Sequence, residues 1–388
     1  MSFYFLFITL FIFSLGDFLA IVTKAKLSSI FTALILFLVC FMTGVIPADI
    51  IKQAGLEQMA NWASAFLVFH MGTMVNIREL VREWRTVLLS IVAMIVTILA
   101  ILATIPIVGK EAAIVSIPVM KGGIIATKIV TDTALDKGMQ VAAALAALVY
   151  AIHKFVGTPF ASYCGIKEAR KIVEDFRAGN LVINDENSNS ASGKQPFYVR
   201  KGLDKFFTDN MCLGLTAFFS WIAVLLQGAT GLHHTIWCLF IGATISYYEL
   251  IPSKILDRAK TSGFMNMVVF AAIIPSMAKI TMSDLIVMSW QMVVLFGATL
   301  ISTYLFFYVL PFWKIVGSRN LAVGITMANM IGFPATWLVV NEVATAVAKT
   351  PEEKDAIMKV LMPSYVIAGF ATVTTLSIVV AGIFIKFL

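Results

Sequence analysis

The stretch VMKGGIIATKIVTDTALDKG, residues 119–138, is polar in a chain that is otherwise dominated by long apolar runs. It carries three lysines, two aspartates, two adjacent glycines and three threonines. Three structures are compatible with it: a poor transmembrane helix, a surface loop, or a polar segment built into a membrane domain. The composition and the loop charges of the whole chain favour the third.

The overall composition is that of a membrane protein. The chain has 388 residues, of which 60% are hydrophobic and only 13% charged, and its mean hydropathy is +0.91. Soluble domains have about 45–50% apolar and about 25% charged residues. Apolar runs of about 18 or more residues recur along the chain, which is the pattern of helices that span a lipid bilayer. We therefore predict an all-α polytopic membrane protein.

The apolar runs divide the chain into two membrane halves. The expected first repeat covers residues 1–164, a cytoplasmic linker covers 165–207, and a second repeat covers 208–388. The linker is the only long hydrophilic segment, and its centre is rich in Asn, Ser and Gly. Ten spans are expected, at 3–22, 27–46, 62–76, 87–108, 139–163, 208–230, 233–252, 264–280, 285–310 and 357–385.

Loop charges give the orientation. The net charge of +7 would suggest nucleic acid as a partner in a soluble protein, but in a membrane protein Lys and Arg gather on cytoplasmic loops. With the linker in the cytoplasm and both termini outside, the basic segments 23–26, 78–85, 253–260 and 314–320 all fall inside. This sorting requires that two further stretches, described next, do not cross the membrane.

These two stretches, 111–136 and 320–347, are apolar but broken by polar residues and by Gly or Pro. The first contains Lys121, Lys128 and Asp132, each of which costs about 2.5–3.5 kcal/mol at the centre of a spanning helix. Non-helical backbone is tolerated at membrane depth where protein or a watery cavity surrounds it. Both stretches are therefore expected to be re-entrant hairpins.

An internal repeat relates the two halves. Residues 44–80 align without gaps on 249–285, and GGIIATKIVTD at 122–132 then aligns with IGFPATWLVVN at 331–341. The second alignment pairs two Gly-x-x-Ala-Thr motifs. Five spans per repeat is an odd number, so the halves must have opposite orientations. Inverted repeats with interrupted helices indicate a secondary transporter whose site lies near the bilayer midplane.

At the level of layout the chain resembles the bacterial sodium–glutamate symporters and, more distantly, the sodium–citrate type of 2-hydroxycarboxylate transporters. Those families have a Gly-Gly-x-Gly turn in each hairpin, where this chain has Gly122–Gly123–Ile124–Ile125 and Gly332–Phe333–Pro334. The resemblance implies a homodimer in the bacterial cytoplasmic (inner) membrane. It also implies an elevator mechanism driven by Na⁺, in which a domain of hairpins slides against a dimeric scaffold.

The candidate site residues lie on the two hairpins. Helix N-termini at a hairpin turn suit a carboxylate, and unwound carbonyls suit a hard cation. Lys121 and Lys128 are alternatively residues that snorkel to the membrane surface or that neutralise Asp132 within the hairpin. The threonines alternatively bond only to the preceding turn. The substrate-binding candidates are Lys121, Gly122, Gly123, Thr127, Asn329, Gly332 and Thr336. The ion-binding candidates are Asp132, Asn341 and Glu342, with a Na⁺ site expected at Asp132 and Asn341.

The expected function is Na⁺-coupled symport of a small anionic amino acid, glutamate-like, or of an organic carboxylate. A cation/proton antiporter is the alternative, although no paired intramembrane aspartates are found. A receptor or scaffold protein is the third reading. No nucleotide-binding loop, haem-attachment CxxCH or HExxH motif is present, so we expect neither an enzyme nor a cofactor other than the coupling ion.

Overall fold

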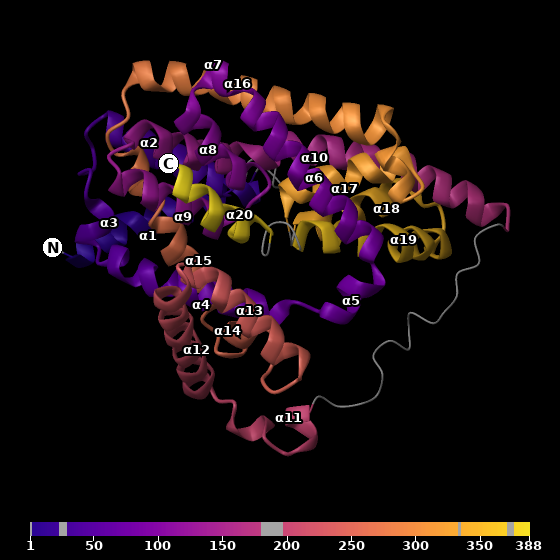
Figure 1. The fold of residues 1–388 in the computed structure, drawn as a ribbon, viewed down its shortest axis with the longest axis horizontal. Helices are drawn as coiled ribbons and strands as arrows, with labels where there is room; N and C mark the ends of the chain where they lie inside the picture. Colours follow the sequence, from indigo (N-terminus) through magenta and orange to yellow (C-terminus); the bar gives the residue numbers. More distant parts are fainter. Residues whose placement is uncertain (1, 23–28, 180–196, 333–334, 371–375) are drawn as a thin grey trace.

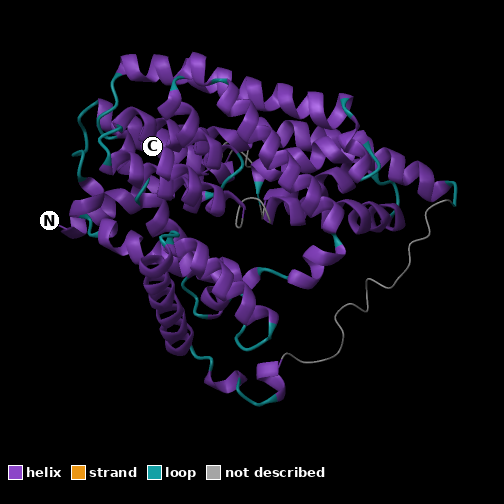
Figure 2. Cartoon of the chain, viewed as in Figure 1, coloured by secondary structure: helices purple, strands orange, loops and turns teal. Residues whose placement is uncertain are grey.

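The computed structural model describes residues 2–22, 29–179, 197–332, 335–370 and 376–388. Within these residues every secondary-structure element is helical, so the all-α prediction is confirmed (Figure 2). Five helices are long and apolar enough to cross a membrane, as in all-α membrane proteins. Several shorter apolar helices of 10–17 residues accompany them.

The described residues of the first half form ten helices, whose arrangement is drawn in Figure 1. Short helices precede or interrupt the long ones, and α8 and α9 are separated by only three residues. The bounds are α1 Ser2–Val22, α2 Ser29–Met42, α3 Ile50–Gln53, α4 Leu56–Met74, α5 Ile77–Arg82, α6 Trp84–Ala103, α7 Ile105–Val108, α8 Lys110–Met120, α9 Ile124–Asp136 and α10 Gln140–Arg177.

The second half follows a similar order of long and short helices. The short α14 precedes α15 as α3 precedes α4, and the pair α17 and α18 corresponds to α8 and α9. The bounds are α11 Phe197–Arg200, η2 Asp204–Phe206, α12 Asp209–Thr230, α13 His234–Tyr247, α14 Ile255–Arg258, α15 Ser262–Ala271, η3 Ile274–Met277, α16 Met282–Tyr304, η4 Leu305–Val309, η5 Pro311–Ile315, α17 Arg319–Ile331, α18 Ala335–Val347, α19 Pro351–Phe370, α20 Ser377–Phe384 and η7 Ile385–Phe387.

Helix α10 corrects one predicted boundary. The sequence predicted a span over 139–163 and a flexible linker from residue 165, but α10 continues to Arg177. The added turns are amphipathic: Ala169, Ile172 and Val173 are buried while the charged side chains between them are largely exposed. The start of the predicted linker is therefore packed helix, and its centre, 180–196, lies outside the described residues.

The helices group around two packing centres. In one, α4 packs against α13, α15 and α12. Its closest crossing is at Gly72 and Gly242, where an added Cβ would come within 2.6 Å of the Leu239 carbonyl oxygen and 2.5 Å of the Phe69 carbonyl oxygen, respectively. Only small residues permit such a crossing. In the other centre, α10 packs against α8, α9, α17, α18 and α19.

Candidate functional site

Helices α8 and α9 form the first hairpin. The helical hydrogen bonding stops after Met120, and α9 starts at Ile124, so residues 121–123 make the turn. The start of α8, at Lys110 and Glu111, and residues 139 and 141, just after α9, line the same cavity. Both ends of the segment therefore lie together, which is the hairpin geometry predicted for this stretch.

Helices α17 and α18 form the second hairpin. Its first end is held by the Ser318 hydroxyl, which donates a hydrogen bond to the Glu168 carboxylate of α10. Its other end, at Val347, lines a surface pocket with Arg170 and Val173 of α10. Both ends thus lie beside the C-terminal part of α10.

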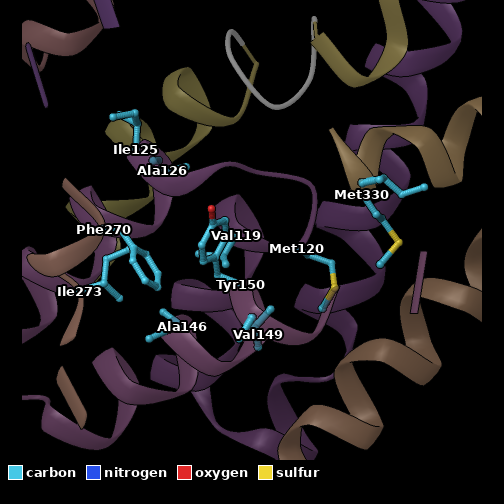
Figure 3. Packing of buried hydrophobic residues seen from close by; sticks show 14 of the residues in the cluster. Val119, Met120, Ile125, Ala126, Ala146, Val149, Tyr150, Phe270, Ile273 and Met330 are labelled. Atoms are coloured by element: carbon cyan, nitrogen blue, oxygen red, sulfur yellow. The ribbon is translucent and has the colours of Figure 1, made fainter. Parts of the chain in front are cut away.

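The two hairpins approach the same part of α10 from its opposite ends. The base of the first hairpin faces Ala142 and Leu145, near the start of α10, whereas the base of the second lies beyond residue 166. The tip of the second hairpin lies between these points, with the Met330 Cβ at 3.1 Å from the position of a Cβ on Gly157. The two tips converge on α6, where Lys121 and Asn329 contact residues one turn apart, Ala93 and Ser90. Figure 3 shows Met120, at the end of α8, and Met330, at the end of α17, on the same side of Val149 and Tyr150 of α10. We call the region formed by residues 121–123, Met330 and Gly157 the tip junction.

Lys121 lies at the tip junction and is completely buried. Its Nζ donates to the carbonyl oxygen of Ala93 on α6, at 3.3 Å. No ion pair joins this ammonium to a carboxylate of the described residues. An ammonium has three donor positions, and a buried charge without a counter-charge is costly. Two donor positions of the Lys121 ammonium are therefore unused among the described residues.

Asn329 brings the second hairpin to the same helix. It is completely buried on α17, and Ser90 on α6 lies 3.3 Å from its side-chain amide. With the amide oriented to satisfy its neighbours, the nitrogen donates to the carbonyl oxygens of Ile325 and Ala368 at 3.2 and 3.1 Å. Ser90 and Ala93 are one turn apart on one face of α6. The structure thus brings together two predicted site residues, Lys121 and Asn329, on one face of α6.

Three glycines form the hairpin turns, and Gly122 has no room for a side chain. A Cβ on Gly122 would lie 2.0 Å from the Pro118 carbonyl oxygen and 3.1 Å from the Ser377 Cβ. Gly332 ends α17 with a φ of 76°, a conformation that favours glycine. Gly123 precedes α9 with extended backbone. The three glycines let the hairpin turns approach the neighbouring backbone.

The two predicted threonines behave differently. The Thr127 hydroxyl donates to the Gly123 carbonyl oxygen at 3.0 Å, so it bonds to the preceding turn. Thr336 is completely buried, and its hydroxyl has no hydrogen-bond partner among the described residues. It packs against α19, where a Cβ on Gly369 would lie 2.7 Å from the Thr336 methyl carbon. Thr336 is therefore the threonine with free hydrogen-bonding capacity.

The predicted ion ligands are not assembled into one site. Asp132 forms an ion pair with Lys128, its neighbour one turn earlier on α9, and the Lys128 ammonium also lies 3.5 Å from the Asn61 amide oxygen. Asn341 is partly exposed and Glu342 exposed, both on α18. No contact found among the described residues joins Asp132 to either of them. The structure thus shows the alternative pairing of Asp132 with Lys128.

The sequence predicted that His153 reaches the membrane interface, but the residue is completely buried on α10. Its Nδ1 donates to the Val149 carbonyl oxygen at 3.2 Å, and its Nε2 has no partner among the described residues. His153 lies one turn before Gly157 on the same face of α10, and hence close to the tip junction. The sequence offers one sign of this position, a histidine a few residues after the alanine-rich stretch 142–147.

Comparison with protein-family models and with curated proteins gives no match for this chain. The similarity to sodium–glutamate symporters therefore remains a resemblance of layout. A functional assignment has to rest on the tip junction and on the helices that build it.

Proposed function

We propose that the protein is a secondary active transporter that binds a small carboxylate at the tip junction and couples its movement to Na⁺. The observation that carries the proposal is the buried ammonium of Lys121, which has a single carbonyl contact and no carboxylate partner among the described residues. A fixed buried cation of this kind is stabilised when an anion binds. On the second hairpin, the buried hydroxyl of Thr336 has no hydrogen-bond partner among the described residues and is available to the same ligand.

The backbone of the hairpins supports the same ligand. Helices α9 and α18 both begin at the tip junction, so their free N–H groups and partial positive charge lie there. Helices α8 and α17 both end there, and their terminal carbonyl groups carry partial negative charge. Paired helix starts and helix ends at mid-membrane depth are the means by which transporters bind an anionic group and a coupling cation together.

The proposed architecture has ten spans in two inverted five-helix repeats, each with one re-entrant hairpin. Its support is the matching order of helices in the two halves and the approach of the hairpins from opposite ends of α10. We propose an elevator mechanism in a homodimer of the bacterial inner membrane, with both termini outside and the linker in the cytoplasm. The preference for Na⁺ comes from the resemblance alone.

A proton-coupled antiporter is the second candidate, and one observation favours it. The Lys128–Asp132 pair sits on a hairpin, with Lys128 buried and Asp132 half-exposed, its side chain 40% accessible. Breaking and re-forming such a pair can couple proton uptake to cation release. In the symporter, the same Asp132 is a Na⁺ ligand that must leave Lys128 when the cation binds.

The test is uptake by proteoliposomes that contain the purified full chain. A panel of labelled mono-, di- and amino-carboxylates is offered under an imposed Na⁺ gradient and then under a H⁺ gradient. The proposal predicts Na⁺-dependent accumulation of at least one carboxylate, and its loss in Lys121→Met. The matched control is Lys137→Met, at the exposed base of the same hairpin. If no carboxylate accumulates while Na⁺ dissipates a pH gradient, the antiporter is the correct function.

A further inference from the structure

A cluster of aromatic and basic side chains lies well away from the tip junction, at the base of the second hairpin. It consists of Tyr163 and Lys167 on α10, Tyr308 on η4, Trp313 on η5 and Arg319 at the start of α17. We call these five residues the aromatic–basic patch. Four helical elements supply them, so the patch exists only in the folded chain.

Both cations of the patch are held over aromatic rings. The Lys167 ammonium lies 4.5 Å from the centre of the Tyr163 ring. The Arg319 guanidinium carbon lies 5.7 Å from the centre of the Tyr308 ring and 5.2 Å from that of Trp313. Such contacts fix the direction of long side chains that would otherwise move freely. The charged groups are thereby positioned without being neutralised.

The two cations belong to one site. The hydrogen bond between Ser318 and Glu168 joins the residues that precede Arg319 and follow Lys167 in the chain, so the two cations lie on adjoining elements. Glu168 is buried and is the acid nearest to the patch in the chain, while Lys314 adds a further exposed positive charge.

Neither cation has an acidic partner within the part of the chain that the structure describes. Lys167 and Arg319 are both exposed, and none of the ion pairs found there includes them. The adjoining surface is apolar: Ile301, Tyr304 and Val309 are exposed by 69%, 58% and 54%. Net positive charge therefore borders a hydrophobic surface that faces outward.

We propose that the aromatic–basic patch binds the headgroup phosphate of an anionic phospholipid, whose acyl chains lie along the exposed side of α16 and η4. Lys167 and Arg319 would contact the phosphate oxygens, since guanidinium and ammonium groups form strong charge-assisted hydrogen bonds with phosphate. Tyrosine and tryptophan rings are enriched at the headgroup level of membranes, and basic pockets between helices bind anionic headgroups. The inference depends on membrane insertion but not on transport.

The test is native mass spectrometry of the detergent-purified full chain with added phosphatidylglycerol or phosphatidylcholine. Each basic residue near an anionic headgroup contributes about a fivefold gain in affinity. The double variant Lys167→Gln/Arg319→Gln should therefore bind phosphatidylglycerol about thirtyfold more weakly than the wild type. The control variant Lys137→Gln/Lys260→Gln removes two exposed lysines elsewhere, with the same change in net charge, and should bind as the wild type does.

Three results would overturn the inference. One is equal binding of phosphatidylglycerol and phosphatidylcholine by the wild type. Another is an equal loss of binding in the control variant, which would show general charge attraction. The third is competition by soluble glycerol phosphate at concentrations similar to those of the lipid, because the patch would then be a site for free anions. Thermal unfolding of both variants without lipid checks that they are folded.

Discussion

Replacing Lys121 by methionine should separate a binding role for this lysine from a structural one. Methionine has a similar length and volume but no charge. The wild-type ammonium is fully buried and has one hydrogen bond, at 3.3 Å, to the Ala93 carbonyl oxygen. A buried charge without a counter-charge is costly, and its replacement by an apolar side chain of similar volume removes that cost. Lys121→Met should therefore unfold at the same temperature as the wild type or at a higher one.

The affinity of Lys121→Met for a carboxylate should decrease, although its stability does not. A carboxylate about 4 Å from an ammonium gains about 4 kcal/mol at an effective dielectric constant near 20. Its loss corresponds to a decrease in affinity of about a thousandfold. Thermal unfolding of the purified protein, titrated with a carboxylate panel, measures both quantities. Lys121→Arg keeps the charge and should retain part of the ligand-induced shift.

One combination of results would show that Lys121 does not bind a carboxylate. If Lys121→Met unfolds well below the wild type and the carboxylates still raise the unfolding temperature of both proteins equally, Lys121 is a structural residue. The Lys137→Met control should change neither the unfolding temperature nor the ligand-induced shift, since its side chain lies at the exposed end of the hairpin.

Three further predictions concern other parts of the fold. Gly72→Ala should lower the free energy of unfolding by about 1–3 kcal/mol, because the new Cβ meets the Leu239 carbonyl oxygen at 2.6 Å. Thermal unfolding measures this change, and an unchanged stability would contradict the tight α4–α13 crossing. The hydrogen bond from Arg177 holds the pKa of Glu353 below its usual value. This pair therefore stabilises the protein fully at a pH above the pKa that Glu353 has in the unfolded chain. The stabilisation is lost as the pH falls through the lower pKa of Glu353 in the folded protein. Glu353→Gln should flatten the decrease in unfolding temperature at acidic pH, and an unchanged pH profile would exclude the pair as its cause. Asp132→Asn should lower the apparent Na⁺ affinity of uptake; an unchanged Na⁺ dependence would leave Asp132 as the structural partner of Lys128 only.

The hairpin turns were predictable because their signal is local. Three costly charges in residues 111–136, together with adjacent glycines, predicted an interruption, and the helix does stop at residues 121–123. The second turn was predicted at Gly332 from the glycine of the repeated Gly-x-x-Ala-Thr motif, and α17 does end at this residue. Polar residues inside an apolar run are a strong signal, since lipid offers them no hydrogen bonds.

The partners of the site residues were not predictable, because they come from distant parts of the sequence. Nothing in α6 marks Ser90 or the Ala93 carbonyl group as neighbours of the hairpins, and only the packing shows it. The length of α10 was missed for a different reason. Residues 165–177 are hydrophilic on average, and an average hides the apolar stripe that buries one side of an amphipathic helix.

Asp132 illustrates the limit of a motif match. The repeat alignment pairs it with Asn341 and so suggested a shared ion site. In the proposed inverted arrangement, however, equivalent positions of the two hairpins lie on opposite sides of the tip junction. At about 1.5 Å per helical residue, nine residues place each of them about 13 Å from its own turn. Sequence equivalence in an inverted repeat therefore predicts similar surroundings, and contact only near the tips.

The approach of the hairpins from opposite faces of the membrane is most directly tested by sidedness labelling. Single cysteines are placed at Lys137 and Lys349, the exposed bases of the first and second hairpins, with Cys40, Cys164, Cys212 and Cys238 replaced by serine. An impermeant maleimide is then applied to intact cells and to inverted membrane vesicles. We predict that the cysteine at 137 reacts only in cells and the cysteine at 349 only in inverted vesicles. Reaction of both from the same side would contradict the inverted arrangement and the carboxylate site built on it.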